Sequence, residues 1–304
     1  MTETWGIDQE VGEASRPGLV LKNYGGFYYV QDQERAVYSC RPRGKVKERI
    51  LSGDRVWFQP LEAGQGVLEN ILPRQNELYR PRVANVSLVL IVMAHRQPKP
   101  DLSLLDRLLV LAEYNHLRPV ILLNKCDLPR DNGVELIEIV YPPLGYSLIF
   151  CSCQEGTGVA AVREQIRDEI AVLSGPSGVG KSSLLAQISG QRHQPPTQAV
   201  SKKIGRGKHT TRHTELFPLA QGGWLVDTPG FSVLELPRIE REDLRQYLPE
   251  FRRWGEECRF GDCLHHKEQD CAVKAALERG EIADHRYKNY LNMLEEVIEN
   301  ERDY

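Results

Sequence analysis

Glycine-broken runs of alternating apolar and polar residues fill the chain between Gly18 and about Leu72. The runs are Val20–Lys22, Gly26–Val30, Ala36–Cys40, Gly53–Phe58 and Gly66–Ile71. Short strands at this spacing are typical of a small all-β barrel or sandwich. Residues 1–17, which precede them, read as a flexible tail.

The pattern changes at Val83, where nearly continuous apolar runs begin to alternate with helical patterns. The run Asn85–Met93 is of the kind expected for a buried parallel strand. Leu102–Glu113 has the pattern of a helix, with Asp101 available as its N-cap. Further strands are expected at Pro119–Leu123, Tyr146–Phe150, Ile170–Leu173 and Gly223–Val226. This alternation predicts an α/β domain with a mostly parallel sheet.

After Pro237 the chain is polar and helical in style, and Glu281–Asn300 has the pattern of a final amphipathic helix. We therefore expect a multidomain protein. Its parts are the tail at 1–17, an OB-type β-barrel at 18–74, an α/β domain at 75–235 and a mostly helical domain at 236–304.

The length of 304 residues allows two or three domains. Apolar residues make up 41% and charged residues 27%, an ordinary globular balance. No apolar run approaches the ~18 residues that span a bilayer, and the first residues lack the basic start and apolar core of a signal peptide. These features predict a cytoplasmic protein without a membrane segment, which we expect to be a monomer.

Basic residues recur after the third expected strand, at Arg41, Arg43, Lys45, Lys47 and Arg49. They stand between two strands and are therefore expected in a loop. An OB-type barrel suits such a loop and often binds oligonucleotides. The net charge of -3 does not indicate nucleic-acid binding, but the local distribution of charge matters more than the total. Arg41, Arg43, Lys45 and Lys47 are thus candidate RNA contacts; the alternative is a solvated charged loop.

A phosphate-binding motif follows the expected strand Ile170–Leu173 and precedes a helix. The motif, Gly175-Pro-Ser-Gly-Val-Gly-Lys-Ser182, fits GxxxxGK[ST] in the context that it requires. Its glycines let backbone N–H groups point at phosphate oxygens, and the helix N-terminus adds partial positive charge. Lys181 is expected to reach the β- and γ-phosphates and to be catalytic, and Ser182 to bind Mg²⁺. The expected nucleotide contacts are Gly175, Pro176, Ser177, Gly178, Val179, Gly180, Lys181, Ser182 and Ser183.

A guanine-binding motif, Asn124-Lys-Cys-Asp127, follows the expected strand Pro119–Leu123. The carboxylate of Asp127 can accept two hydrogen bonds from guanine, whereas adenine lacks this donor pair and would leave a buried carboxylate unpaired. Lys125 can lie over the base, Asn124 can tie the loop to its neighbours, and Cys126 completes the motif. Beside a phosphate-binding loop, this motif favours GTP over ATP.

The pair Ser152-Cys153 follows another expected strand, at a position where many GTPases carry Ser-Ala. Backbone N–H groups there support the guanine carbonyl. Cysteine is about as small as alanine, so both residues are expected to contact GTP.

Two further segments complete the expected site. Asp227-Thr-Pro-Gly230 fits DxxG, in which Asp227 holds Mg²⁺ through water and the Gly230 amide contacts the γ-phosphate. The next residue is Phe231, where several GTPases carry a water-orienting glutamine. Upstream, the basic segment 202–212 offers Thr210 or Thr211 as a Mg²⁺ ligand, and His209 as a candidate for orienting the attacking water; the alternative is a mobile basic loop.

Three of the seven cysteines gather in the C-terminal region. Cys258, Cys263, His265 and Cys271 form the ligand set of a closed tetrahedral zinc site, with His266 as an alternative ligand. Such a site has no open position for water, so we expect one structural Zn²⁺ per chain. The alternative is a group of buried cysteines in a helical region.

The order of the motifs is permuted. In most GTPases the phosphate-binding loop comes first, whereas here the motifs at Asn124 and Ser152 precede it. Folded domains often tolerate moved chain ends, so the site can be the same in space. The DxxG segment then leads directly into the C-terminal domain, so nucleotide state could be coupled to that domain.

In these features the chain resembles the RsgA family of small-subunit-dependent GTPases, also called YjeQ or YloQ. The resemblance covers almost the whole chain after the tail. It rests on Val37–Gly44, Gly53–Val56, Leu72–Leu78, Arg80–Val86, the permuted motifs, Gly207–Thr211 and the cysteine spacing. It implies an OB barrel, a circularly permuted GTPase domain and a C-terminal zinc domain.

The resemblance also implies late maturation of the small ribosomal subunit, contact with its rRNA, and GTP hydrolysis stimulated by that subunit. His209 matches a family histidine proposed as catalytic. Cys153 and Arg212 depart from the family pattern, and Arg212 leaves open which threonine binds Mg²⁺. An alternative function is a nucleotide-gated rRNA-binding module with negligible turnover, which Phe231 would suit.

Overall fold

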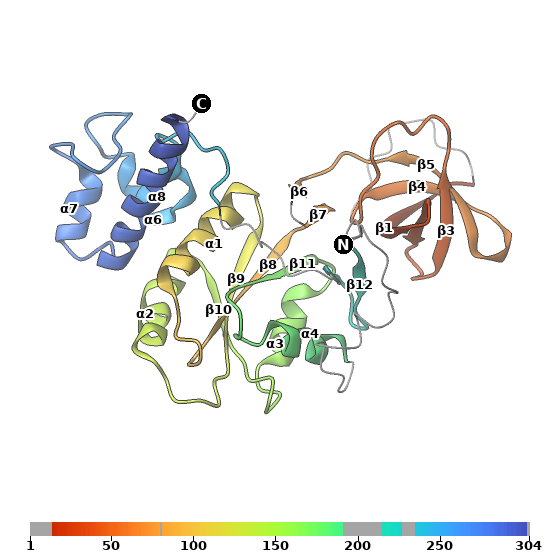
Figure 1. The fold of residues 1–304 in the computed structure, drawn as a ribbon, viewed down its shortest axis with the longest axis horizontal. Coiled ribbons are helices and arrows are strands. Elements are labelled where there is room, and N and C mark those ends of the chain that lie inside the picture. Colours follow the sequence, from red (N-terminus) through yellow and green to blue (C-terminus); the bar gives the residue numbers. More distant parts are fainter. Residues whose placement is uncertain (1–13, 80, 191–213, 227–234, 303–304) are drawn as a thin grey trace. The chain divides into compact units, whose positions relative to one another are not determined.

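A computed structural model describes residues 14–79, 81–190, 214–226 and 235–302 (Figure 1). The chain divides into two compact units. One contains the residues up to Ser87 together with Ile166–Val172 and the described part of Pro196–Gly230. The other contains Leu88–Gln165 and the described parts of Leu173–Pro195 and Phe231–Tyr304.

The first unit begins with a closed five-stranded barrel, as the sequence predicts. Its strands are β1 (Arg16–Tyr24), β2 (Phe27–Gln31), β3 (Val37–Pro42), β4 (Arg55–Pro60) and β5 (Gln65–Ile71), with a 3₁₀ turn η1 at Glu62–Gly64. They neighbour one another in the order β1-β2-β3-β5-β4. The pair β3 and β5 is parallel, and the other pairs are antiparallel.

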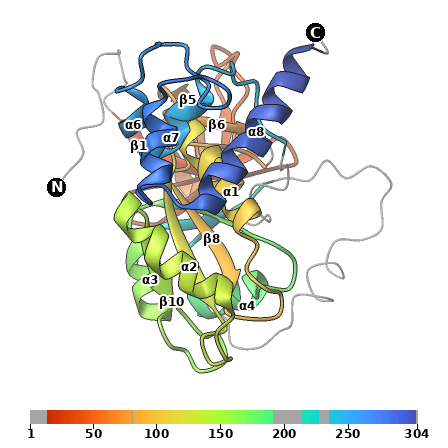
Figure 2. The ribbon, with the colours of Figure 1, turned by 90° about the vertical axis from the view of Figure 1, so that its left-hand side faces the viewer.

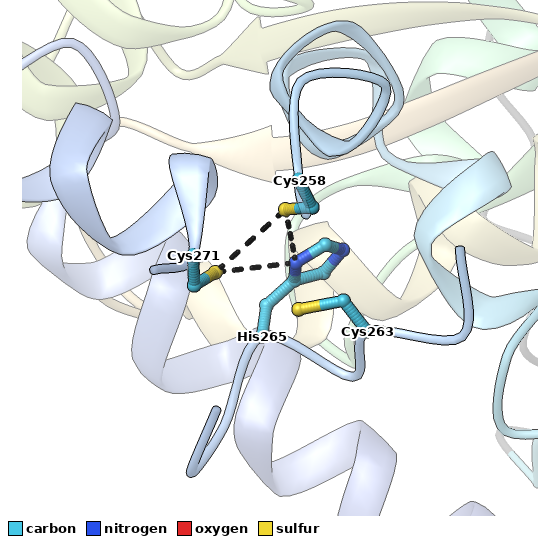
Figure 3. Close-up of side chains that lie close together, drawn as sticks. All are labelled: Cys258, Cys263, His265 and Cys271. Carbon is cyan, nitrogen blue, oxygen red and sulfur yellow. Dashed lines mark hydrogen bonds between the residues drawn. The ribbon is translucent and has the colours of Figure 1, made fainter. Parts of the chain in front are cut away.

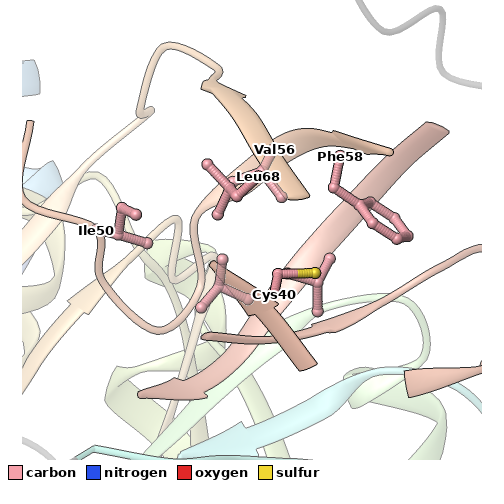
Figure 4. Close-up of a cluster of buried hydrophobic side chains, with 7 residues drawn as sticks. Cys40, Ile50, Val56, Phe58 and Leu68 are labelled. Atoms are coloured by element: carbon pink, nitrogen blue, oxygen red, sulfur yellow. The ribbon is translucent and has the colours of Figure 1, made fainter. Parts of the chain in front are cut away.

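Alternate residues of these strands point into the barrel because successive side chains of a strand face opposite ways. The buried set contains Val20, Val30, Cys40, Val56, Phe58 and Leu68 from the strands, and Ile50 from the loop before β4 (Figure 4). Burial raises the pKa of the Cys40 thiol to about 12. This cysteine is therefore a neutral, apolar residue of the barrel core.

The prediction that the whole basic run forms a loop is wrong for Arg41. Strand β3 continues to Pro42 because it pairs in parallel with β5, with Arg41 opposite Val67. The Arg41 guanidinium lies 4.6 Å from the centre of the Phe27 ring. The rest of the run follows β3, and Lys45 and Lys47 are exposed there.

A small hairpin that the sequence analysis did not predict links the barrel to the next strand. It consists of β6 (Glu77–Tyr79) and β7 (Arg82–Ala84). The Ala84 N–H donates to the Ser52 carbonyl at 2.9 Å, and the Asn85 amide donates to the Gly53 carbonyl at 2.9 Å. These bonds fix the hairpin against the loop before β4.

A second sheet has six strands in the order β10-β9-β8-β11-β13-β12. They are β8 (Leu88–Ala94), β9 (Arg118–Asn124), β10 (Ser147–Phe150), β11 (Ile170–Ser174), β12 (Leu216–Pro218) and β13 (Trp224–Val226). Strand β9 pairs in parallel with β8 and β10, and β11 pairs in parallel with β13. Strands β12 and β13 are antiparallel neighbours. All of β8 is buried, as its continuous apolar run predicts.

In the described part of this domain the helices between the strands are α1 (Leu102–Tyr114), α2 (Asn132–Val140), α3 (Val159–Ile166) and α4 (Lys181–Ser189), with a 3₁₀ turn η2 at Pro142–Leu144. The side chain of Asp101 accepts the Leu104 N–H at 3.0 Å, so it caps α1 as predicted.

The C-terminal region is helical. It contains the 3₁₀ turn η3 (Leu244–Tyr247) and the helices α6 (Pro249–Gly255), α7 (Ala272–Glu278) and α8 (Asp284–Arg302). Figure 2 shows α8 running beside α1. None of the helices in the described ranges is long and apolar enough to cross a membrane.

Candidate functional site

The predicted motifs meet at the carboxyl ends of three strands. Asn124 ends β9, Gly175 follows β11, and His95 follows β8. The His95 N–H donates to the Asn124 carbonyl at 2.9 Å, which joins two of these ends. In α/β sheets this edge is where ligands bind.

The turn after β11 leaves no room for side chains at two of its glycines. Gly175 has a φ of 131°, and a Cβ there would lie 2.1 Å from the Val92 carbonyl oxygen. Gly180 has a φ of 97°, and its Cβ would lie 2.4 Å from Nδ2 of Asn124. The turn therefore curls closely against β8 and the guanine motif, which requires glycine.

Lys181 opens α4 and reaches back over this turn. Its Nζ donates to the carbonyls of Gly175 and Pro176, both at 2.7 Å. Burial lowers the pKa of this ammonium. Phosphate oxygens would be stronger partners for it than neutral carbonyls, because they carry negative charge that attracts the ammonium.

The guanine motif is tied to the phosphate turn by two side chains. The Asn124 amide is buried and donates from Nδ2 to the Val179 carbonyl at 2.8 Å. The Lys125 ammonium donates to the Gly178 carbonyl at 2.7 Å and also to the Gln97 carbonyl. The loop expected to bind the base and the loop expected to bind the phosphates are thus held at one fixed spacing.

The predicted Ser152-Cys153 pair holds the guanine motif, with Ser152 bonded to Asp127 and Cys153 to Asn124. The Ser152 hydroxyl donates to Oδ1 of Asp127 at 2.5 Å and accepts the Glu155 N–H at 3.2 Å. The Cys153 thiol lies 3.5 Å from Oδ1 of Asn124 and donates to it. Burial raises the pKa of this thiol, which keeps the donor proton in place. Ser152 leaves the second oxygen of Asp127 for a ligand.

Several predicted residues lie outside the described ranges: His209, Thr210, Thr211, Asp227, Gly230 and Phe231. Among the described residues the structure brings together Asn124, Lys125, Cys126, Asp127, Ser152, Cys153 and the turn 175–182. Ser182 and Ser183 are exposed at the start of α4, where a hydroxyl is accessible to a bound cation.

The predicted metal ligands also come together. One donor atom from each of Cys258, Cys263, His265 and Cys271 lies within 4.8 Å of the others (Figure 3). The Cys258 and Cys271 sulfurs are 3.9 Å apart, and Nδ1 of His265 lies 3.5 Å and 3.4 Å from them. His266, the alternative ligand, is not part of this group; its N–H donates to Glu268.

These distances fit a tetrahedral zinc site. Ligands at ordinary zinc distances lie about 3.8 Å apart for two thiolates and about 3.6 Å for a thiolate and an imidazole. Burial lowers the pKa of His265 to about 4, so the ring is neutral and can act as a ligand. Three thiolates and one imidazole are a donor set that Zn²⁺ prefers.

Sequence reasoning missed three supporting residues. Gln97 accepts the Lys125 ammonium through its carbonyl. Tyr287 and Tyr290 donate from their hydroxyls to the carbonyls of His265 and Leu264, at 2.8 Å and 3.0 Å. A position just after a buried parallel strand could have indicated Gln97. The tyrosines show only the spacing of an ordinary amphipathic helix.

Two family models match the chain. The model described as RsgA N-terminal domain matches residues 17–68, and the model described as RsgA GTPase matches residues 71–237. Curated relatives named small ribosomal subunit biogenesis GTPase RsgA include proteins of Moorella thermoacetica and Carboxydothermus hydrogenoformans. Each is 46% identical to this chain, and each alignment covers 94% of this chain and 99% of the relative.

Solved structures of YjeQ and YloQ are also similar to this chain. YjeQ from Thermotoga maritima matches with a TM-score of 0.81 and 37% identity, over 93% of this chain and 99% of that one. The structure of YloQ, described as a circularly permuted GTPase, matches with a TM-score of 0.81 and 34% identity, over 96% and 98%.

Proposed function

The chain belongs to the RsgA family of circularly permuted GTPases and is a GTP hydrolase, and we propose that the small ribosomal subunit stimulates its hydrolysis during a late step of subunit maturation. The names of its relatives support a role in small-subunit biogenesis. We further propose that it acts as a monomer in the cytoplasm, with the three domains and boundaries expected from the sequence.

One observation supports GTP as the substrate above the others. Asn124 and Lys125 join the guanine motif to the phosphate turn, while Ser152 orients the Asp127 carboxylate. Because the Ser152 hydroxyl donates to Oδ1 of Asp127, the carboxylate is held in an orientation in which it can accept the two N–H donors of guanine. An adenine would leave it unpaired, at a cost of about 1–3 kcal/mol or more.

For the chemistry, we propose that Lys181 and the N–H groups of the turn bind the β- and γ-phosphates. Mg²⁺ would neutralise developing charge on the phosphates. Its proposed ligands are Ser182, Thr210 or Thr211, and Asp227 through water. His209 is the proposed residue that orients the attacking water, since Phe231 has no polar group for that role.

We propose that the cluster Cys258, Cys263, His265 and Cys271 holds one structural Zn²⁺. The cluster supports this through its spacing and its soft donor set. The metal would crosslink the loop between α6 and α7, where few apolar residues are buried.

The function is tested by measuring GTP hydrolysis in single turnover, with and without purified small subunits. We expect a rate increase of about 10-fold or more when subunits are added, since contacts with the subunit would position the catalytic groups around the γ-phosphate. An equal rate in both samples, with tight nucleotide-dependent binding to the subunit, would instead identify a nucleotide-gated rRNA-binding module.

The exposed lysines after β3 provide a test of RNA contact. Arg43 is paired with Glu69 at 2.6 Å, which leaves Lys45 and Lys47 as the better candidates for phosphate contacts. The double variant Lys45→Ala, Lys47→Ala should bind small subunits more weakly. The slope of log affinity against log salt should fall by about 1 for each lysine.

The matched control removes two cations from the same barrel. Arg16 is paired with Glu34, and Lys22 with Glu215. The variant Arg16→Ala, Lys22→Ala should therefore keep nearly the wild-type salt slope. Equal slopes for wild type and the Lys45, Lys47 variant in a sedimentation assay would contradict RNA contact at this loop.

A further inference from the structure

A buried group of charged residues joins α8 to α1 and α6. Arg286 of α8 is 1% exposed, Asp106 of α1 is 0% exposed and Glu250 of α6 is 5% exposed. The Arg286 guanidinium donates to Asp106 at 2.6 Å and to both oxygens of Glu250 at 2.6 Å and 2.9 Å. Burial alone would lower the pKa of Arg286, but the two carboxylates raise it well above its ordinary value.

Further hydrogen bonds complete the group around Asp106. The Tyr141 hydroxyl donates to its Oδ1 at 2.6 Å, and the Asn289 amide donates to its Oδ2 at 2.6 Å. Two carboxylates share one guanidinium here, and these neutral donors stabilise the extra negative charge. The members depend on one another in two ways: losing Arg286 would leave two buried carboxylates without a cation, and losing the Asp106 charge would remove the ion pair that joins α8 to α1.

The same turns of α8 hold the metal-ligand loop. Tyr287 follows Arg286 in the chain, and Tyr290 follows Asn289. Their hydroxyls bind the carbonyls of His265 and Leu264, whereas Arg286 and Asn289 bind Asp106. Adjacent residues of α8 thus hold two different elements: the tyrosines bind the loop of the proposed zinc site, and their neighbours bind α1.

We propose that zinc binding and the docking of α8 onto α1 are thermodynamically linked, with Asp106 and Arg286 as positioning residues that strengthen zinc binding from the GTPase domain. This linkage rests on the proposed zinc site. A correctly placed α8 presents Tyr287 and Tyr290 to the ligand loop before the metal arrives, which lowers the cost of ordering that loop. Linkage is reciprocal: the factor by which docking strengthens zinc binding is also the factor by which bound zinc strengthens the docking of α8 onto α1.

The zinc affinity of the full-length protein is measured by competition with a chromophoric chelator. Asp106→Asn keeps the size of the side chain but removes the ion pair between α1 and Arg286, which is then paired only with Glu250. It also sets an NH₂ group against the Asn289 amide donor. We expect about tenfold weaker zinc binding, within the usual range of coupling between sites. Glu281→Gln is the matched control, because it breaks an exposed pair with Arg279 that touches neither α1 nor the ligand loop. Its zinc affinity should stay within about twofold of wild type.

Two more measurements separate linkage from general damage. Tyr287→Phe removes only the bond to the ligand loop, so it should weaken zinc binding in the wild-type background by about five- to tenfold. In the Asp106→Asn background, where the docking of α8 onto α1 should already be weakened, the effect of Tyr287→Phe should be smaller. Independently, removing zinc from the wild-type protein should raise hydrogen exchange at residues 105–112 of α1.

The outcomes decide between the proposals. Zinc bound equally tightly by wild type and Asp106→Asn overturns the linkage and leaves the zinc site standing. A wild-type protein that binds no zinc overturns both. If Asp106→Asn does not fold, hydrogen exchange of the wild type decides alone: faster exchange in α1 on zinc removal supports the linkage, and unchanged exchange overturns it.

Discussion

Replacing Lys181 by alanine is expected to reduce kcat/KM for GTP by about 100- to 1,000-fold, with most of the loss in kcat. The Lys181 ammonium lies over the phosphate turn and donates to the carbonyls of Gly175 and Pro176. In the transition state of phosphoryl transfer, negative charge spreads over the phosphate oxygens, and a positioned cation stabilises it more than it stabilises bound GTP. The measurement is single-turnover hydrolysis with small subunits present.

Lys288→Ala is the control for this variant, since it removes an exposed lysine from α8. It should hydrolyse GTP at the wild-type rate. Hydrolysis by Lys181→Ala at the wild-type rate, in a protein free of contaminating GTPases, would show that the turn 175–182 is not the catalytic phosphate site.

The second large effect is expected at the metal cluster, where substitutions of the adjacent residues His265 and His266 distinguish the ligand from the non-ligand. His265→Asn should lose its zinc and the order of the loop between α6 and α7. Asparagine tolerates the positive φ of 56° at this position, so the change removes the ligand with little backbone strain. Structural zinc sites contribute about 10–16 kcal/mol of apparent binding free energy, comparable to the whole stability of a small domain.

His266→Ala is the matched control, because the His266 ring is not part of the cluster. Metal analysis should find one zinc per chain in this variant and in the wild type, and close to none in His265→Asn. Hydrogen exchange over residues 249–279 should rise only in His265→Asn. Zinc retained by His265→Asn and lost by His266→Ala would assign the ligand to the other histidine.

The fold was largely predictable because its signals are local. Alternation marked the barrel strands, and continuous apolar runs marked β8, β9 and β11. The placement of Arg41 was wrong because β3 is extended by its pairing with β5, a partner distant in sequence. The β6 and β7 strands are three residues long each, too short for a periodic pattern to indicate them.

For the candidate site, the motif residues were predictable from the sequence but most of their supporting contacts were not. The motifs and their positions after expected strands indicated that Asn124, Asp127 and the turn after β11 belong to one nucleotide site. The supporting contacts were not predictable in the same way. Asp106 occupies a helix position that could equally face solvent, and its burial depends on Arg286, which is 180 residues away. Long-range ion pairs leave no mark in the periodicity of either helix.

The separation between Asp106 and Arg286 has a consequence for how the protein is made. At a synthesis rate of about 5–20 residues per second, the 180 residues between them take roughly 9–36 s to add. During that interval the newborn chain contains α1 and β8 but lacks the cation that allows Asp106 to be buried. The translating ribosome therefore carries a chain whose α1 cannot yet take its final environment, and burial of Asp106 waits for α8 to be translated.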